Sequence, residues 1–111
     1  MSKFDEKMEL YTSEFKKLGI SFDAALFEKV AKGLGPSIYK ADAEKVSCTQ
    51  ESEMETIKKN FLMKKLGFSD GPKLDAAIKA ACEKLGQSNK NKYRTMFYYL
   101  LVKELGAEKK Y

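Results

Sequence analysis

The stretch SNKNKYRTMFYYLL, residues 88–101, combines three cations with a dense run of aromatic and aliphatic side chains. When residues 93–105 are placed on a helical wheel at about 100° per residue, apolar side chains cover well over half of the circumference. A helix that is apolar nearly all round is buried by its neighbours. The pattern therefore predicts a central helix that is opened by Ser88 or Asn89 and runs to about Leu105.

The aromatic rings of this helix are expected to lie in the core. Rings that stack on nucleic-acid bases must face solvent, and Tyr99 is the ring we expect to do so, because it lies opposite the main apolar arc. The arc itself is formed by Tyr93, Met96, Phe97, Leu100 and Leu101, and it is extended by Tyr98, Val102 and Leu105.

The three cations fall in the first turns of the predicted helix, where the helix dipole disfavours positive charge. Backbone N–H groups without a partner at a helix start attract anions, so cations there suggest an anion site. No aspartate or glutamate lies between residues 84 and 103. The alternative is that the lysines are solvated and the arginine pairs with a structural carboxylate. The residues of this candidate site are Asn89, Lys90, Lys92 and Arg94.

Arg94 is the only arginine among the 21 lysine and arginine residues of the chain. It lies at the edge of the apolar arc, with Tyr98 one turn further on. A half-buried cation at such a position needs a planar partner or an aromatic face, which arginine uses better than lysine. We therefore expect Arg94 and Tyr98 to form a structural anchor rather than a catalytic pair.

Four further helices are predicted from apolar stripes and from the residues that start and stop helices. The second begins after Ser21 and ends near Gly33–Gly35, and Pro36 then opens a short extra helical turn. The third is capped by Ser47 or Thr49. The first helix carries a stripe with the spacing of a coiled-coil seam, formed by Phe4, Met8, Tyr11, Phe15 and Leu18.

The fourth of these helices is opened by Asp70, Gly71 and Pro72. Leu-Gly pairs recur along the chain, most of them after lysine or glutamate, and they are typical of helix ends, where glycine takes the left-handed conformation. The alternation of apolar and polar residues that is typical of strands is absent. The Leu-Gly pairs stand at 18–19, 34–35, 66–67, 85–86 and 105–106.

A length of 111 residues suits one domain with one core. Residues 1–111 are therefore expected to form a single all-α domain, a compact bundle of about five helices plus the short extra turn. No apolar run approaches the roughly 20 residues that span a bilayer, and the opening MSKFDEKMELY lacks the apolar region of a secretory signal. We expect a cytoplasmic protein without a membrane partner.

Histidine is absent from the chain, which removes the commonest metal ligand and the usual general base at neutral pH. We predict no metal site, no cofactor and no catalytic residue. Cys48 and Cys82 are expected to be reduced thiols, with a bridge between them as the alternative. Cys48 would lie in an exposed loop as the candidate reactive thiol, and Cys82 on an apolar helix face.

Five blocks of the chain, GLGPSIY, KKNFL, KKLG, SNKNKYR and FYYLL, resemble a small bacterial family of unknown function, the domain of unknown function twenty-eight fifty-three. The similarity covers nearly the whole chain, and GLGPSIY and SNKNKYR are its most specific parts. The resemblance implies a bacterial source and a compact single domain, and it suggests that the segment 43–50 is free to vary. It carries no catalytic residue to this chain, because the family has no established activity.

Two functions from different classes are considered. The first is a non-enzymatic binding or structural module, whose first helix packs inside the domain or pairs with a second copy through its stripe. The second is binding of nucleic acid or a phosphorylated ligand by the basic start of the last helix, which a net charge of +5 permits. We favour the first, because lysine is also the ordinary solubilising residue of helical surfaces and no activated nucleophile is visible.

Overall fold

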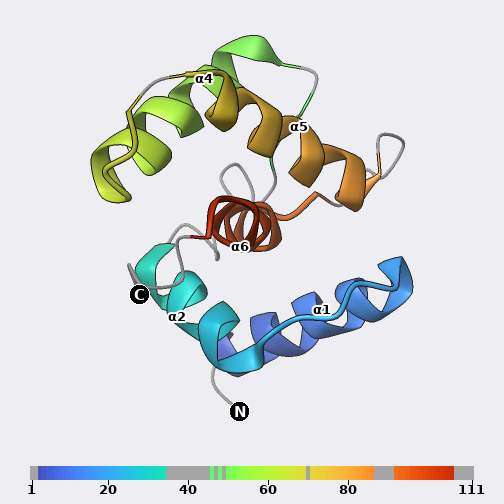
Figure 1. Cartoon of the computed structure of the whole chain (residues 1–111). Coiled ribbons are helices and arrows are strands. Elements are labelled where there is room, and N and C mark those ends of the chain that lie inside the picture. Colours follow the sequence, from blue (N-terminus) through green and yellow to red (C-terminus); the bar gives the residue numbers. More distant parts are fainter. Residues whose placement is uncertain are drawn as a thin grey trace.

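Helix α6 (Arg94–Leu105) passes through the middle of the computed structural model. Figure 1 shows this helix end-on, with α4 and α5 on one side of it and α1 and α2 on the other. Nine of its 12 residues are buried, so the prediction of a central helix is confirmed. The structure describes residues 3–34, 46, 48, 50–69, 71–86 and 92–106.

Two helical layers enclose α6. The first layer is formed by α1 (Lys3–Leu18) and α2 (Ala24–Leu34). The second is formed by α4 (Glu51–Ile57), by η2 (Lys58–Lys65) and by α5 (Pro72–Leu85).

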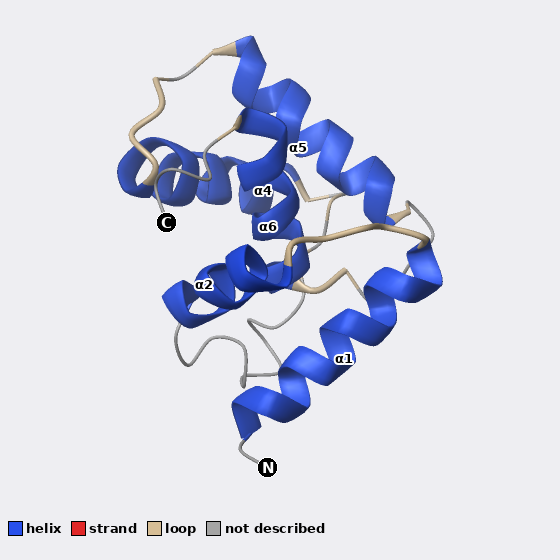
Figure 2. Cartoon of the chain, turned by 60° about the horizontal axis from the view of Figure 1, so that its bottom comes forward, coloured by secondary structure: helices blue, strands red, loops and turns tan. Residues whose placement is uncertain are grey.

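The predicted all-α class and the compact bundle of about five helices are confirmed. The described residues contain no strand, as Figure 2 shows. The radius of gyration of 13.1 Å is close to the roughly 13 Å expected of a compact domain of this length. No helix in the described part of the chain is both long and apolar enough to cross a membrane. The short turn predicted after Pro36 lies outside the described residues.

The contact between α6 and the first layer is a cluster of aromatic rings. Phe15 stacks on Phe22 with ring centroids 4.6 Å apart, and Phe27 meets Tyr99 edge to face at 5.5 Å. Tyr11 joins the cluster through an edge contact with Phe27 at 5.7 Å. Pairs of this geometry are worth about 0.5–1.5 kcal/mol beyond the area they bury, so this cluster is a main source of cohesion between the first layer and α6.

Tyr99 lies inside this cluster, and the prediction that its ring faces solvent is wrong. The residue is 1% exposed, and its hydroxyl oxygen accepts a hydrogen bond from the backbone N–H of Asp23 at 2.7 Å. A buried tyrosine hydroxyl needs such a partner. The first layer covers the side of α6 that the helical wheel left open.

Helix α2 begins two residues later than predicted, because Asp23 rather than Ser21 caps it. The Oδ1 atom of Asp23 accepts hydrogen bonds from the backbone N–H groups of Ala25 at 3.0 Å and Leu26 at 3.3 Å. These bonds satisfy two of the N–H groups that a helix start leaves without partners. Tyr99 holds the N–H of the same aspartate, so the central helix also fixes where α2 begins.

The start of α6 also differs from the prediction, which placed it at Ser88 or Asn89. The helix begins at Arg94, after Tyr93 in extended conformation. Lys92, which precedes Tyr93, accepts a hydrogen bond at its backbone oxygen from the N–H of Val46 at 2.8 Å. This pairing with a distant segment holds residues 92–93 outside the helix.

The third predicted helix is continuous but changes its winding. After α4, the segment η2 is a π-helix, a wider winding whose hydrogen bonds span five residues instead of four. At its end the N–H of Leu66 donates to the backbone oxygen of Phe61 at 3.0 Å. The Phe61 ring stacks on Tyr98 of α6 with centroids 4.1 Å apart.

Gln50 precedes α4 without a side-chain cap, and the predicted caps Ser47 and Thr49 lie outside the described residues.

The Leu-Gly pairs that are fully described end helices as predicted, whereas Gly35 of the pair 34–35 lies outside the described residues. At the end of α1, Gly19 has a positive φ of 70°, and its N–H donates to the oxygen of Lys16 at 3.1 Å. The N–H of Ile20 donates to the oxygen of Phe15 at 3.0 Å. This pair of bonds is the Schellman arrangement, in which a glycine reverses the chain and satisfies the last carbonyl groups.

Candidate functional site

The predicted anion site at the start of the last helix is not assembled as the sequence suggested. Arg94 is the first residue of α6, whereas Lys92 precedes the helix and is only 7% exposed. Asn89 and Lys90 lie outside the described residues. Of the described cations in this set, only Arg94 therefore lies in the first turn of α6.

Arg94 is engaged by two other side chains. Its Nη2 lies 3.2 Å from Oε1 of Glu53 on α4, and its Nη1 donates to the hydroxyl oxygen of Tyr98 at 3.2 Å. The guanidinium carbon lies 5.8 Å from the centroid of the Tyr98 ring. This is the arrangement expected of a structural anchor, since it ties the start of α6 to the second layer. The stabilising role of Arg94 and Tyr98 stays a prediction, for which a test is given below.

The two cysteines form a disulfide, so the expectation that they are reduced thiols is corrected. The bond between Cys48 and Cys82 joins residues 34 positions apart whose Cα atoms lie at 6.1 Å, a usual separation for a disulfide. It links the segment before α4 to the last turn of α5. Cys82 is buried, at 9% exposure, whereas Cys48 is half-buried.

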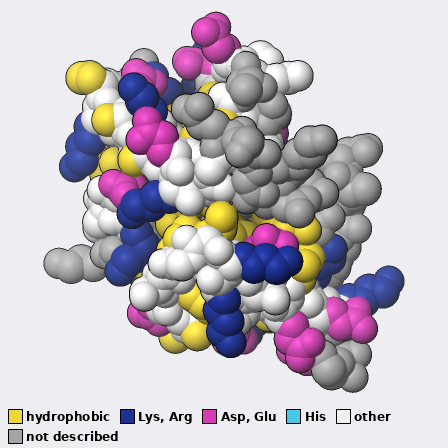
Figure 3. Space-filling view, turned by 90° about the vertical axis from the view of Figure 1, so that its right-hand side faces the viewer, with side chains coloured by type: hydrophobic (Ala, Val, Ile, Leu, Met, Phe, Trp, Pro, Cys, Tyr) yellow, Lys and Arg dark blue, Asp and Glu magenta, His cyan; other side chains and the backbone are white. Residues whose placement is uncertain are grey.

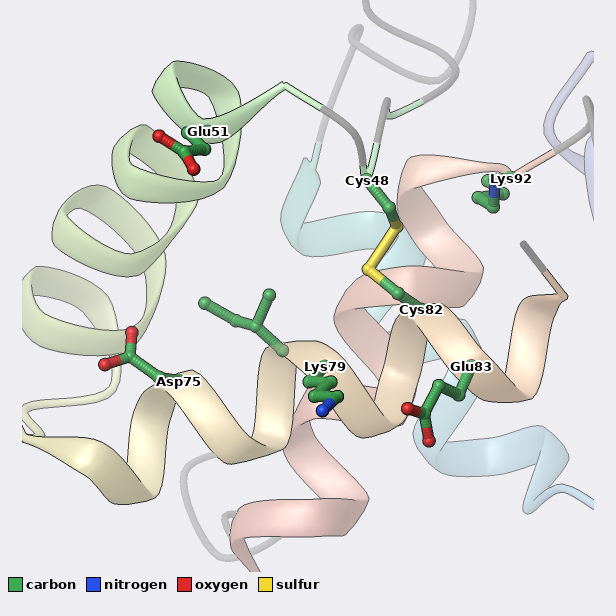
Figure 4. Close-up of a pocket in the computed structure, with 8 residues that line it drawn as sticks. Cys48, Glu51, Asp75, Lys79, Cys82, Glu83 and Lys92 are labelled. Carbon is green, nitrogen blue, oxygen red and sulfur yellow. A yellow bond between two sulfur atoms is a disulfide. The ribbon is translucent and has the colours of Figure 1, made fainter. Parts of the chain in front are cut away.

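The disulfide lies in the wall of a pocket of about 740 Å³. Figure 4 shows the residues of this pocket at the start of α4, along α5 and at Lys92, two positions before α6. The side chains that line it are Cys48, Glu51, Asp75, Ile78, Lys79, Cys82, Glu83 and Lys92.

The pocket carries charges of both signs beside a small apolar surface. Asp75 is paired through its Oδ1 with the ammonium group of Lys58 at 3.0 Å. Beyond this pair, two carboxylates and two ammonium groups line the walls, and the side chain of Ile78 and the disulfide supply the apolar part. The charged groups outside the Asp75 pair are Glu51, Glu83, Lys79 and Lys92.

The presence of both charge signs in one pocket suits a small zwitterion. A zwitterion can place a carboxylate near the lysines and an ammonium group near the glutamates. Among the described residues, no group of three or more His, Cys, Asp or Glu side chains is placed to hold a metal ion. We identify no activated nucleophile in this pocket, because both thiols are in the disulfide.

The seam of helix α1 is used within the chain. Tyr11 and Phe15 are fully buried in the aromatic cluster, while Phe4, Met8 and Leu18 are half-buried. Pairing of two chains through α1 stays a prediction, and it would have to use this half-buried part. A smaller hollow of about 350 Å³ lies on the outer side of α1, lined by Met8, Glu9, Thr12, Ser13 and Lys16.

Sequence reasoning missed the pocket, although one signal for it was present. Asp75, Lys79 and Glu83 follow one another at four-residue spacing, which places them on one face of α5. Cys82 lies beside that face, three residues after Lys79. The missing information was the position of Cys48, which no local pattern provides.

The comparison with protein families shows to which family the chain belongs. The family described as "Protein of unknown function (DUF2853)" matches residues 10–109. The chain belongs to this family, and the resemblance noted from the sequence blocks is confirmed. No curated protein matches the chain at a significant level.

Proposed function

We propose that this protein is a non-enzymatic binding module, and that the pocket beside the Cys48–Cys82 disulfide binds a small zwitterion. The observation that carries the proposal is the presence of both charge signs around one hollow. The volume of about 740 Å³ falls within the roughly 300–1,000 Å³ of pockets that bind small molecules. Amino acids and short peptides are the class of ligand that fits this chemistry.

The framework of the pocket supports binding without large rearrangement. Five of its eight lining side chains come from α5, a helix that packs its other side into the core. The disulfide holds the segment of Cys48 against that helix, and the Val46–Lys92 backbone hydrogen bond of 2.8 Å holds the same segment near α6. A rigid site loses little freedom on binding, which favours affinity.

The alternative function, binding of nucleic acid or a phosphorylated ligand at the start of α6, has weaker support. Arg94 already pairs with Glu53 at 3.2 Å. On the face shown in Figure 3, lysine and arginine side chains are interspersed with aspartate and glutamate. Nucleic-acid-binding proteins instead collect their cations in one patch or stripe.

The proposal is tested by nuclear magnetic resonance with the oxidised protein and S-methylglutathione. This tripeptide has one ammonium group and two carboxylates, and its sulfur is blocked so that it cannot react with the disulfide. We expect saturable shifts of the backbone amide signals of Lys79, Cys82 and Glu83. Absence of saturable shifts on α5, with this peptide and with the dipeptide lysyl-glutamate, would contradict the proposal.

A parallel titration distinguishes the alternative. A single-stranded oligonucleotide and inorganic phosphate are added to the same protein at low and high salt. Shifts at Lys92, Arg94 and Thr95 that weaken with salt would favour the alternative, since phosphate contacts release counterions. We expect no saturable shift with either probe.

A further inference from the structure

We propose that the Cys48–Cys82 disulfide is a thiol–disulfide exchange site whose reductant is a small anionic thiol that enters through the pocket. The disulfide forms part of the wall of an open pocket, so a solute that enters can reach it. Exposed disulfides are the labile ones, whereas structural disulfides resist small thiols. The inference rests on the proposed pocket for the approach of the thiol.

The two cysteines differ in exposure, which favours attack at Cys48. Cys48 is half-buried and lies in a segment outside the helices, whereas Cys82 is only 9% exposed in α5. The incoming thiolate attacks Sγ of Cys48. The Sγ–Sγ bond breaks, its electron pair stays on Sγ of Cys82, and the small thiol is held to Cys48 as a mixed disulfide.

Lys79 is placed to assist this step. It precedes Cys82 by three residues on α5, which brings the two side chains to the same side of the helix. Both residues line the pocket, and Figure 4 shows them on the same stretch of α5. A cation near a sulfur stabilises the thiolate that leaves, and the same cation attracts a thiol that carries a carboxylate.

The exchange is completed by a second molecule of the same thiol. Its thiolate attacks the sulfur of the small thiol in the mixed disulfide and releases Cys48 as a thiolate. Two small thiols are thereby oxidised to one disulfide, the protein gains two electrons, and the protein thiolates take protons from water. The Val46–Lys92 hydrogen bond and the burial of Val46 in the core still hold the segment, so we expect the reduced protein to stay folded.

The inference is tested by reducing the native protein without denaturant. Oxidised wild type is incubated with glutathione, which carries a net negative charge, or with uncharged 2-mercaptoethanol. Free cysteines are then blocked with a maleimide and counted by mass spectrometry at successive times. We expect both thiols to reduce the native protein to two free cysteines.

Two variants with the same charge change provide the test of the entry path. Lys79→Glu places a negative charge in the pocket, and Lys73→Glu places one on the same helix outside the lining residues. We expect Lys79→Glu to slow reduction by glutathione roughly three- to tenfold, as a reversed charge near the surface allows. The rate with 2-mercaptoethanol should change far less, and Lys73→Glu should resemble wild type with both thiols.

Two results would overturn the inference. The first is that no cysteine becomes free until denaturant is added, which would make the disulfide a purely structural bond. The second is that Lys79→Glu and Lys73→Glu have equal effects on the glutathione rate, which would exclude entry of an anionic thiol beside Lys79. Binding of S-methylglutathione is measured separately, so either failure is distinguishable from a failure of the binding function.

Discussion

The hydroxyl oxygen of Tyr99 lies 2.7 Å from the backbone nitrogen of Asp23 and accepts its hydrogen bond. This contact joins the middle of the central helix to the capping residue of α2, 76 positions earlier in the chain. It therefore couples the last helix to the start of the second. A local pattern of residues contains no information about a bond of this kind.

Removing the hydroxyl group tests how much this bond contributes. Tyr99→Phe keeps the ring in the aromatic cluster but leaves the N–H of Asp23 without its partner. We expect a loss of about 1 kcal/mol in the free energy of unfolding, the usual net worth of one hydrogen bond, measured by urea denaturation. Tyr98→Phe is the control: it should cost less, because Arg94 keeps Glu53. Equal stability of Tyr99→Phe and wild type would argue against the bond.

The anchoring role of Arg94 is tested by a double-mutant cycle. Arg94→Lys loses the planar group that meets both Glu53 and Tyr98, so we expect a loss of about 1 kcal/mol in the free energy of unfolding. Glu53→Gln should cost a similar amount in wild type and much less in the Arg94→Lys background. Strictly additive losses would show that the two side chains do not act together.

The position of the α1 seam is tested by introducing a charge into it. Phe15 is fully buried among aromatic rings, and an unpaired carboxylate there is strongly unfavourable. We expect Phe15→Glu to abolish the cooperative thermal transition seen by circular dichroism. Ser13→Glu, which adds the same charge two residues away at an exposed position, should leave the transition intact. A folded monomer of Phe15→Glu, seen by sedimentation, would instead place the seam between chains.

The disulfide should contribute to stability as well as to the pocket wall. It closes a loop across 34 positions, and a cross-link of this length restricts the unfolded chain. We expect the double variant Cys48→Ser with Cys82→Ser to lose about 2–4 kcal/mol in the free energy of unfolding, measured against oxidised wild type. Reduced wild type should match the double variant. If oxidised and reduced wild type were equally stable, the bond would not constrain the chain.

Most of the fold was predictable because it depends on local patterns. The apolar arc of 93–105 identified the central helix, and the Leu-Gly pairs marked where helices end. The start of α6 was not predictable, since the backbone pairing of Lys92 with Val46 replaces helix at that point. The exposure of Tyr99 was also misjudged. A helical wheel ranks faces by their apolar content, and it cannot show that the first layer covers the face of α6 that carries Tyr99.

The candidate site was less predictable than the fold. The spacing of Asp75, Lys79 and Glu83 indicated a charged face on α5, but such a face is usually only solvated. It becomes the wall of a pocket because Cys48 is bonded to Cys82 from a distant segment. Whether two cysteines meet depends on tertiary distance, which a single sequence does not contain.

The most direct measurement of the proposed function is the dissociation constant of S-methylglutathione, determined by isothermal titration calorimetry for wild type and three charge variants. We predict that Lys79→Glu and Glu83→Lys each weaken binding by roughly three- to tenfold, because each reverses one charge of the pocket. Lys73→Glu should bind as wild type does. Absence of binding to wild type, or equal affinity in all four proteins, would contradict the account.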